Sequence, residues 1–173
     1  ELDFATHRVA TTLWDVASRK LIHRWDREYV LAVSPDSSLV ATTSWDRSIR
    51  LRDRVTGNLR ATLPGHGDRV PSGEFSPDGK RLITGDYGNV VIIWDVESKR
   101  EIERLHVRDF TLQTLALSPD GRFLAVAGNL VGFMDVDGKP WRGDLTGNAT
   151  DVAGFFTKTN GYNAFITHYA NLI

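Results

Sequence analysis

Residues 75–95 read FSPDGKRLITGDYGNVVIIWD, and this stretch holds the pattern that decides the fold. Ser-Pro-Asp-Gly is typical of a type I turn, because Pro presets the second position, Asp suits the third and Gly closes the turn. The turn joins two predicted strands, at 70–75 and 81–85. Residues 90–94 are a continuous run rich in β-branched side chains, which is typical of a strand buried on both faces. A polar outer strand is expected near 100–105.

The same pattern recurs along the chain at a regular interval. Ser-Pro-Asp occurs three times, 42 residues apart each time, beginning at Ser34, Ser76 and Ser118. Trp94-Asp95 follows the second copy by 18 residues, and Arg52-Asp53 follows the first by the same distance. Four short strands per repeat, with no helical periodicity, are typical of a propeller blade. A lone blade cannot bury its two faces, so neighbouring blades must stack on it.

These repeats resemble the WD-repeat family in the order and spacing of their markers, namely Gly65-His66, then Phe75-Ser76-Pro77-Asp78-Gly79, then Trp94-Asp95. The resemblance covers nearly the whole chain and implies an all-β fold. We expect a β-propeller fragment of four-stranded blades: a half blade, three full blades and a half blade, in an open arc. The full blades are expected at 26–64, 65–106 and 107–147, after the end of a blade at 1–25 and before the start of another at 148–173.

Composition removes several classes of function. The chain has 21 basic and 22 acidic residues and a net charge of −1, so no bulk charge favours nucleic acid or an anionic membrane. It contains no cysteine, which excludes disulfides, thiolate zinc sites and cysteine nucleophiles. The longest apolar runs are five residues, far short of a membrane span. We expect no metal and no cofactor, and we predict a cytoplasmic location.

One group of residues suggests chemistry: His66, Thr84, Asp86 and Trp94. A histidine, a hydroxyl and a carboxylate could form a site of the Ser-His-Asp kind. The family resemblance implies instead a structural tetrad of these four side chains, which satisfies buried polar groups at the edge of a blade. The family's usual Asp position falls on Gly88 in this repeat, so Asp86 or Asn89 would have to replace it. We favour the structural interpretation.

The other repeats depart further from the family pattern. Their histidine positions are occupied by Arg24, Arg108 and Asn148, so most tetrads are incomplete. Arg52 stands where the Trp of its repeat is expected. A buried unpaired guanidinium would be costly, so we predict that Arg52 reaches solvent or pairs with Asp46. An aspartate follows that position once per repeat, at Asp15, Asp53, Asp95 and Asp135, which favours a role in turns over acid–base catalysis.

The expected function is that of a non-catalytic scaffold that binds a protein or peptide on its blade-loop face. Trp45 and Tyr87 occupy equivalent loop positions in adjacent repeats, and aromatic side chains commonly anchor interfaces. The loops entering two blades add three further candidates for partner binding, Trp25, Asp68 and Arg69. These rings could instead pack against neighbouring blades. Exposure to solvent would favour binding, and full burial would favour packing.

Two other functions stay open on the sequence alone. The propeller could be an arm that regulates a fused catalytic domain such as a kinase or a protease, so further blades or a fused domain of the same parent chain are also expected partners. It could also be a propeller enzyme. Such enzymes draw inward-facing Asp, Glu, Asn or His side chains from several blades, and no set of this kind is evident in the repeats.

Overall fold

The computed structural model describes residues 9–107, 112–128 and 131–135. In these ranges the chain forms thirteen strands and no helix, as the repeat pattern predicts. The strands are β1 (Ala10–Asp15), β2 (Lys20–Asp26), β3 (Glu28–Val33), β4 (Leu39–Ser44), β5 (Ile49–Asp53), β6 (Leu59–Leu63), β7 (Ser72–Phe75), β8 (Arg81–Gly85), β9 (Val90–Asp95), β10 (Arg100–His106), β11 (Leu112–Leu117), β12 (Phe123–Gly128) and β13 (Val131–Asp135). Within this part of the chain, no helix is long and apolar enough to cross a membrane.

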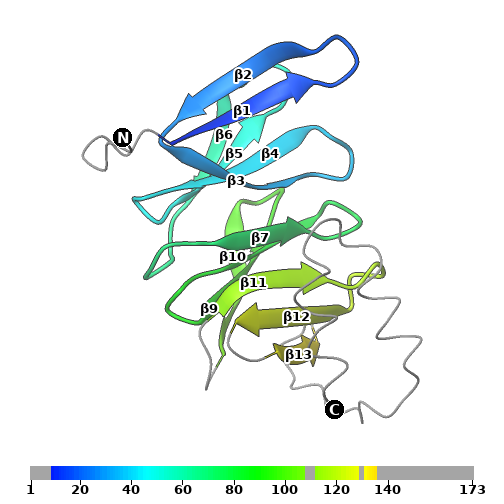
Figure 1. Cartoon of the computed structure of the whole chain (residues 1–173). Coiled ribbons are helices and arrows are strands. Elements are labelled where there is room, and N and C mark those ends of the chain that lie inside the picture. Colours follow the sequence, from blue (N-terminus) through cyan, green and yellow to red (C-terminus); the bar gives the residue numbers. More distant parts are fainter. Residues whose placement is uncertain (1–8, 108–111, 129–130, 136–173) are drawn as a thin grey trace.

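The strands form four separate antiparallel sheets that follow one another along the chain. The first sheet is β1-β2, the second β3-β4-β5-β6, the third β7-β8-β9-β10 and the fourth β11-β12-β13. Figure 1 shows the sheets stacked in an open row, from the blue β1 and β2 to the yellow β12 and β13. The first strand of the third sheet, β7, contacts the first strand of the second sheet, β3, and that of the fourth, β11. The second and third sheets each have the four strands expected of a full blade.

Strand positions agree closely with those predicted from the repeat. The largest difference is at β7, which begins at Ser72 although a strand was expected from residue 70. Pro71 precedes it, and because proline has no backbone N–H it cannot donate to the neighbouring strand. The blade boundaries stay a prediction. The segment from 148 onward and the fourth strand expected after β13 lie outside the described residues.

The Ser-Pro-Asp turns repeat in atomic detail. In each turn the serine hydroxyl donates to the aspartate two residues later, and the serine carbonyl accepts the N–H three residues later at 2.8 Å. That fourth position has positive φ, which favours glycine, and it is Gly79 and Gly121 in two copies. A Cβ at Gly121 would lie 2.9 Å from Pro77 Cδ, so the turns of the third and fourth sheets touch. The repeated turns thereby help to set the spacing of the stack.

Apolar side chains fill the spaces between the sheets. One cluster joins the second and third sheets through Ile49, Leu51, Leu82, Ile92 and Trp94. Another joins the opposite face of the third sheet to the fourth, through Ile83, Val91, Ile93, Leu115 and Leu124. The residues of β9 alternate between these two clusters, which is why its sequence is an uninterrupted apolar run. The core thus lies between sheets, and each sheet depends on its neighbours.

Trp94 should be the most costly side chain of this core to truncate. It is 2% exposed and lies in the cluster between the second and third sheets. We expect Trp94→Ala to lower the free energy of unfolding by about 3–5 kcal/mol, because a large buried side chain is lost and a cavity remains. Urea denaturation followed by circular dichroism measures the change. Trp14→Ala is the matched control, since Trp14 is 54% exposed, and should change stability by less than about 0.5 kcal/mol. Equal losses in both variants would contradict the assignment of the core.

Candidate functional site

A groove of about 300 Å³ opens between the second and third sheets. The second sheet contributes the start of β3 and the β4–β5 loop, and the third sheet contributes the segment leading into β7 and the β8–β9 loop. We call it the interblade groove, and its lining residues are Tyr29, Val30, Leu31, Thr43, Ser44, Trp45, Arg69, Val70, Pro71 and Tyr87. Apolar and aromatic side chains dominate this lining.

Three of the residues predicted to bind a partner meet in the interblade groove. Trp45 is 41% exposed and Tyr87 is 43% exposed, so both rings are open to solvent on one side. The guanidinium of Arg69 lies over the Trp45 ring, with its central carbon 4.7 Å from the ring centroid. Tyr29 meets Trp45 edge-on, with 5.9 Å between the ring centroids. The sequence pattern found Trp45, Tyr87 and Arg69 but missed Tyr29, which lies on a strand rather than in a loop.

Hydrogen bonds between loops hold the rim of the groove. The backbone N–H of Tyr87 donates to the Arg69 carbonyl at 3.0 Å, which ties together the two segments from the third sheet. The Arg47 guanidinium donates to the Gly67 carbonyl at 2.6 Å, which joins the second sheet to the third. Asp68 accepts from the Arg69 backbone N–H at 2.7 Å. Asp68 therefore shapes the loop and is absent from the lining of the groove.

Trp25, which was also predicted to bind a partner, does not line the interblade groove. It is only 7% exposed. Its indole N–H donates to the Gly57 carbonyl at 3.0 Å, and the Arg52 guanidinium lies over its ring at 5.5 Å. Trp25 closes the space between the first and second sheets, so it packs against a neighbouring blade, the alternative that burial favours.

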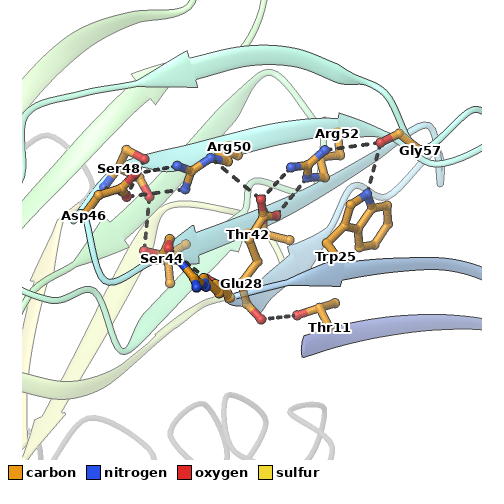
Figure 2. A network of polar contacts seen from close by, with 12 residues as sticks. Thr11, Trp25, Glu28, Thr42, Ser44, Asp46, Ser48, Arg50, Arg52 and Gly57 are labelled. Carbon is orange, nitrogen blue, oxygen red and sulfur yellow. Dashed lines mark hydrogen bonds and ion pairs between the residues drawn. The ribbon is translucent and has the colours of Figure 1, made fainter. Parts of the chain in front are cut away.

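A polar network occupies the face of the second sheet that looks toward the first (Figure 2). Glu28 is its centre and is buried. Its carboxylate accepts from Arg52 Nε at 2.8 Å and from the Thr42 hydroxyl at 2.6 Å. Arg50 lies 3.7 Å from the same carboxylate. The Glu28 backbone carbonyl also accepts from the Thr11 hydroxyl of β1 at 2.8 Å, which links the network to the first sheet.

The structure corrects the partner predicted for Arg52. Arg52 pairs with Glu28, whereas Asp46, in the β4–β5 loop, pairs with Arg50 of β5. Glu28, Arg50 and Arg52 share one face of the sheet, because β3 and β5 flank β4 in register. Burial acts to raise the pKa of Glu28, but hydrogen bonds from Arg52 and Thr42 and the charges of both arginines outweigh it and lower the pKa below its usual range. Glu28 is thus ionised at neutral pH.

Breaking this ion pair should destabilise the protein. Arg52→Met should lower the free energy of unfolding by about 2–4 kcal/mol, because Glu28 would be left buried without its main partner. Glu28→Gln should cost a similar amount alone and much less in the Arg52→Met background, as expected for two groups that act together. Chemical denaturation of the four proteins in this cycle provides the measurement. Additive losses would show that the two side chains do not depend on each other.

The four residues of the predicted tetrad are joined in one hydrogen-bonded chain on the equivalent face of the third sheet. The Trp94 indole N–H donates to the Thr84 hydroxyl at 2.8 Å, and this hydroxyl lies 2.7 Å from His66 Nε2. His66 Nδ1 lies 2.9 Å from Asp86 Oδ2. Asn89, the alternative to Asp86, instead accepts the Leu112 backbone N–H at 2.8 Å. A neutral His66 that carries its proton on Nδ1 satisfies every contact in the chain.

The tetrad is sealed from solvent in this structure. The side chains of His66 and Asp86 are both 0% exposed, so no substrate reaches this histidine–hydroxyl pair. Burial lowers the pKa of His66, and the hydrogen bond and charge of Asp86 only partly oppose this effect. The geometry is what a structural tetrad requires, and the structural role itself stays a prediction.

The lowered pKa of His66 leads to a pH dependence of stability. In the unfolded chain the imidazole takes up a proton below about pH 6.5, whereas in the folded protein it resists protonation. Because the unfolded state then binds more protons, stability should fall as the pH drops from about 7.5 to about 5.5. His66→Gln should lower the free energy of unfolding by about 1–3 kcal/mol at neutral pH and should make its decline at lower pH less steep. Urea denaturation at several pH values, with exposed His106→Gln as control, tests it. If stability fell with pH as steeply in His66→Gln as in the wild type, the pH dependence would not arise from His66.

The repeated aspartates serve turns, as predicted, wherever their side chains are described. Asp15, Asp53 and Asp95 each accept the backbone N–H three residues later, at 2.6–2.7 Å. These hydrogen bonds lower the pKa of each carboxylate and keep it ionised. The side chain of Asp135 lies outside the described residues. In the part of the chain that is described, no three His, Asp or Glu side chains gather in a way that could hold a metal ion.

Comparison with known proteins identifies the repeat. The family model for the WD domain, G-beta repeat (WD40), matches residues 19–53 and 57–95. The chain belongs to the WD-repeat family. The two matched segments each begin at the last strand of one sheet and end with the third strand of the next, so a WD repeat as matched here spans two neighbouring blades.

Two curated relatives share the WD-repeat sequence. The chain is 33% identical over 123 residues to Protein groucho of Drosophila melanogaster, which covers 66% of this chain and 16% of that protein. It is 31% identical over 135 residues to Transcription factor unc-37 of Caenorhabditis elegans, which covers 73% of this chain and 22% of that protein. The chain therefore spans less than a quarter of the length of either relative.

A solved structure confirms the propeller architecture. The chain superposes on Kuenenia stuttgartiensis hydrazine synthase with a TM-score of 0.69, over 76% of this chain and 42% of that chain. Sequence identity in this comparison is 20%, so the similarity concerns the fold alone. Together with the unclosed row of sheets, it supports an open arc of propeller blades.

Proposed function

We propose that this WD-repeat chain is a non-catalytic scaffold that binds a protein or peptide partner in the interblade groove. The observation that carries the proposal is the exposure of Trp45 and Tyr87, two aromatic side chains at equivalent positions of adjacent repeats that line one groove. Aromatic and arginine side chains provide much of the binding energy at protein interfaces, since they bury large areas at modest entropic cost. Arg69 supplies the arginine.

The rigidity of the groove favours binding further. Hydrogen bonds from Arg47 and Tyr87 hold the loops on both sides, so little ordering of the backbone is needed when a partner docks. The groove also spans two blades, so it depends on the stacking of the second and third sheets. A scaffold role is general in the WD-repeat family. The identity of the partner, any fused domain and the cytoplasmic location stay predictions.

Substitution of the two exposed rings tests the proposal. Trp45→Ala combined with Tyr87→Ala should abolish recovery of partners that the immobilised wild-type protein retains from an extract of its own cells, because the groove loses most of its apolar area. Mass spectrometry of the retained proteins measures the loss. Trp14→Ala removes an exposed ring from the first sheet, far from the groove in sequence, and should retain the same partners.

Stability must be measured in parallel, because lost folding also removes binding. Both Trp45 and Tyr87 are half-exposed, so thermal unfolding of the double variant should stay within a few degrees of the wild type. Unchanged partner recovery by a folded double variant would eliminate the interblade groove as the binding site.

A further inference from the structure

We infer that the interblade groove selects a peptide in which one Asp or Glu lies next to an apolar or aromatic side chain. This inference rests on the proposed function and adds the chemical class of the partner. Its basis is the juxtaposition of one available cation, Arg69, with an aromatic and apolar lining.

Arg69 is an available anion receptor. It is exposed, and its guanidinium lies over the Trp45 ring. Within the described residues, no carboxylate forms an ion pair with this guanidinium. Stacking on a ring leaves the N–H groups at the edge of the guanidinium available, and these match the two oxygens of a carboxylate. An incoming carboxylate can therefore bind to Arg69 while the stack stays in place.

The carboxylates nearest to the groove in sequence already have partners. Glu28 is paired with Arg52, and Asp46 is paired with Arg50. Asp86 is bound to His66 and to the Val90 backbone N–H. Asp68 accepts the backbone N–H of Arg69 and does not line the groove. The lining thus contains one positive charge and no negative charge, which is complementary to an anionic ligand.

The rest of the lining defines what must accompany the carboxylate. Val30, Pro71 and the rings of Tyr29 and Tyr87 surround the Arg69–Trp45 stack in one groove. Val30 is more than half exposed, so it offers apolar area that a ligand can bury. A free acid or a small anion would leave this surface in water. A peptide with an apolar side chain beside its acidic residue covers both parts at once.

The arrangement favours a carboxylate over a phosphate. Phosphorylated motifs are commonly recognised by clusters of arginines, which match the charge of a dianion. The groove has a single arginine in its lining, and the neighbouring Arg47 guanidinium is engaged with the Gly67 carbonyl. One guanidinium matches one carboxylate in charge and in geometry. We therefore assign the anion to an Asp or Glu side chain.

Selection from a random peptide library displayed on phage tests the inference with the full chain. Selections are made in parallel on the wild type, on Arg69→Gln and on the double variant Trp45→Ala, Tyr87→Ala. Peptides selected on the wild type should be enriched in Asp or Glu beside Trp, Phe, Tyr, Leu or Pro. The acidic enrichment should vanish on Arg69→Gln while the apolar enrichment persists. Arg60→Gln is the matched control, because Arg60 is exposed on the outer strand β6 and pairs with Asp53 of β5.

Synthetic peptides from the selection give the quantitative test. Replacing the acidic residue by Gln or Asn should weaken binding to the wild type by about tenfold or more, as expected for the loss of a charge-assisted hydrogen-bonded pair. The same replacement should have no effect on Arg69→Gln. Arg69→Lys should bind with intermediate affinity, since it keeps the charge but not the two-pronged geometry. Fluorescence anisotropy at low and high salt measures all of these affinities.

The outcomes separate this inference from the proposed function. Selected peptides that need Trp45 and Tyr87 but carry no acidic enrichment would overturn the inference and leave the groove as a binding site. A phosphoserine peptide that binds more tightly than its Glu counterpart would overturn the choice of carboxylate. If no selected peptide depended on Trp45 and Tyr87, both the inference and the proposed function would be wrong.

Discussion

The burial of sheet faces against one another is the interaction on which the rest of this structure depends. In the described residues no helix covers a sheet, and the two clusters of buried apolar side chains lie between neighbouring sheets. The interblade groove exists only because the second and third sheets stack, since its two walls come from different sheets. The stability of the scaffold and the proposed binding site therefore both depend on the contact between the second and third sheets.

Each interface uses different chemistry at equivalent positions. Between the first and second sheets the central groups are Thr42, Glu28 and Arg52, which form an ionic network. Between the second and third sheets Thr84 and Trp94 belong to a neutral hydrogen-bonded tetrad surrounded by apolar side chains. Between the third and fourth sheets the central cluster is apolar and Val126 replaces the threonine, while Ser72, Glu74 and Asn89 accept backbone N–H groups of the fourth sheet around it. One repeat thus accommodates charge, hydrogen bonding or hydrocarbon at its centre.

The repeat made the fold predictable, whereas side-chain partners were predictable only in part. A spacing of 42 residues sets strand order and turn positions, because both depend on local chemistry such as Ser-Pro-Asp-Gly. The partner of Arg52 was missed because Glu28 lies 24 residues away on a strand that is not its direct neighbour. Alternation of side chains along β3 and β5 could have placed both on one face. Trp25 was expected in a loop but lies in β2, because a loop residue and the end of a strand look alike in sequence.

Because the interfaces differ in chemistry, they also favour one order in which the sheets stack. A chain of similar repeats can pair the wrong neighbours during folding, or exchange a sheet with another molecule, since each repeat has nearly the same shape. If the second sheet stacked in place of the fourth, the face of Glu28 and Arg52 would meet the apolar cluster of the third sheet and would lose its Thr11 and Trp25 contacts. Such an arrangement would be disfavoured by the cost of covering charges with hydrocarbon. The arginine at position 52, where the family has tryptophan, therefore favours stacking of the second sheet on the first over stacking on another sheet.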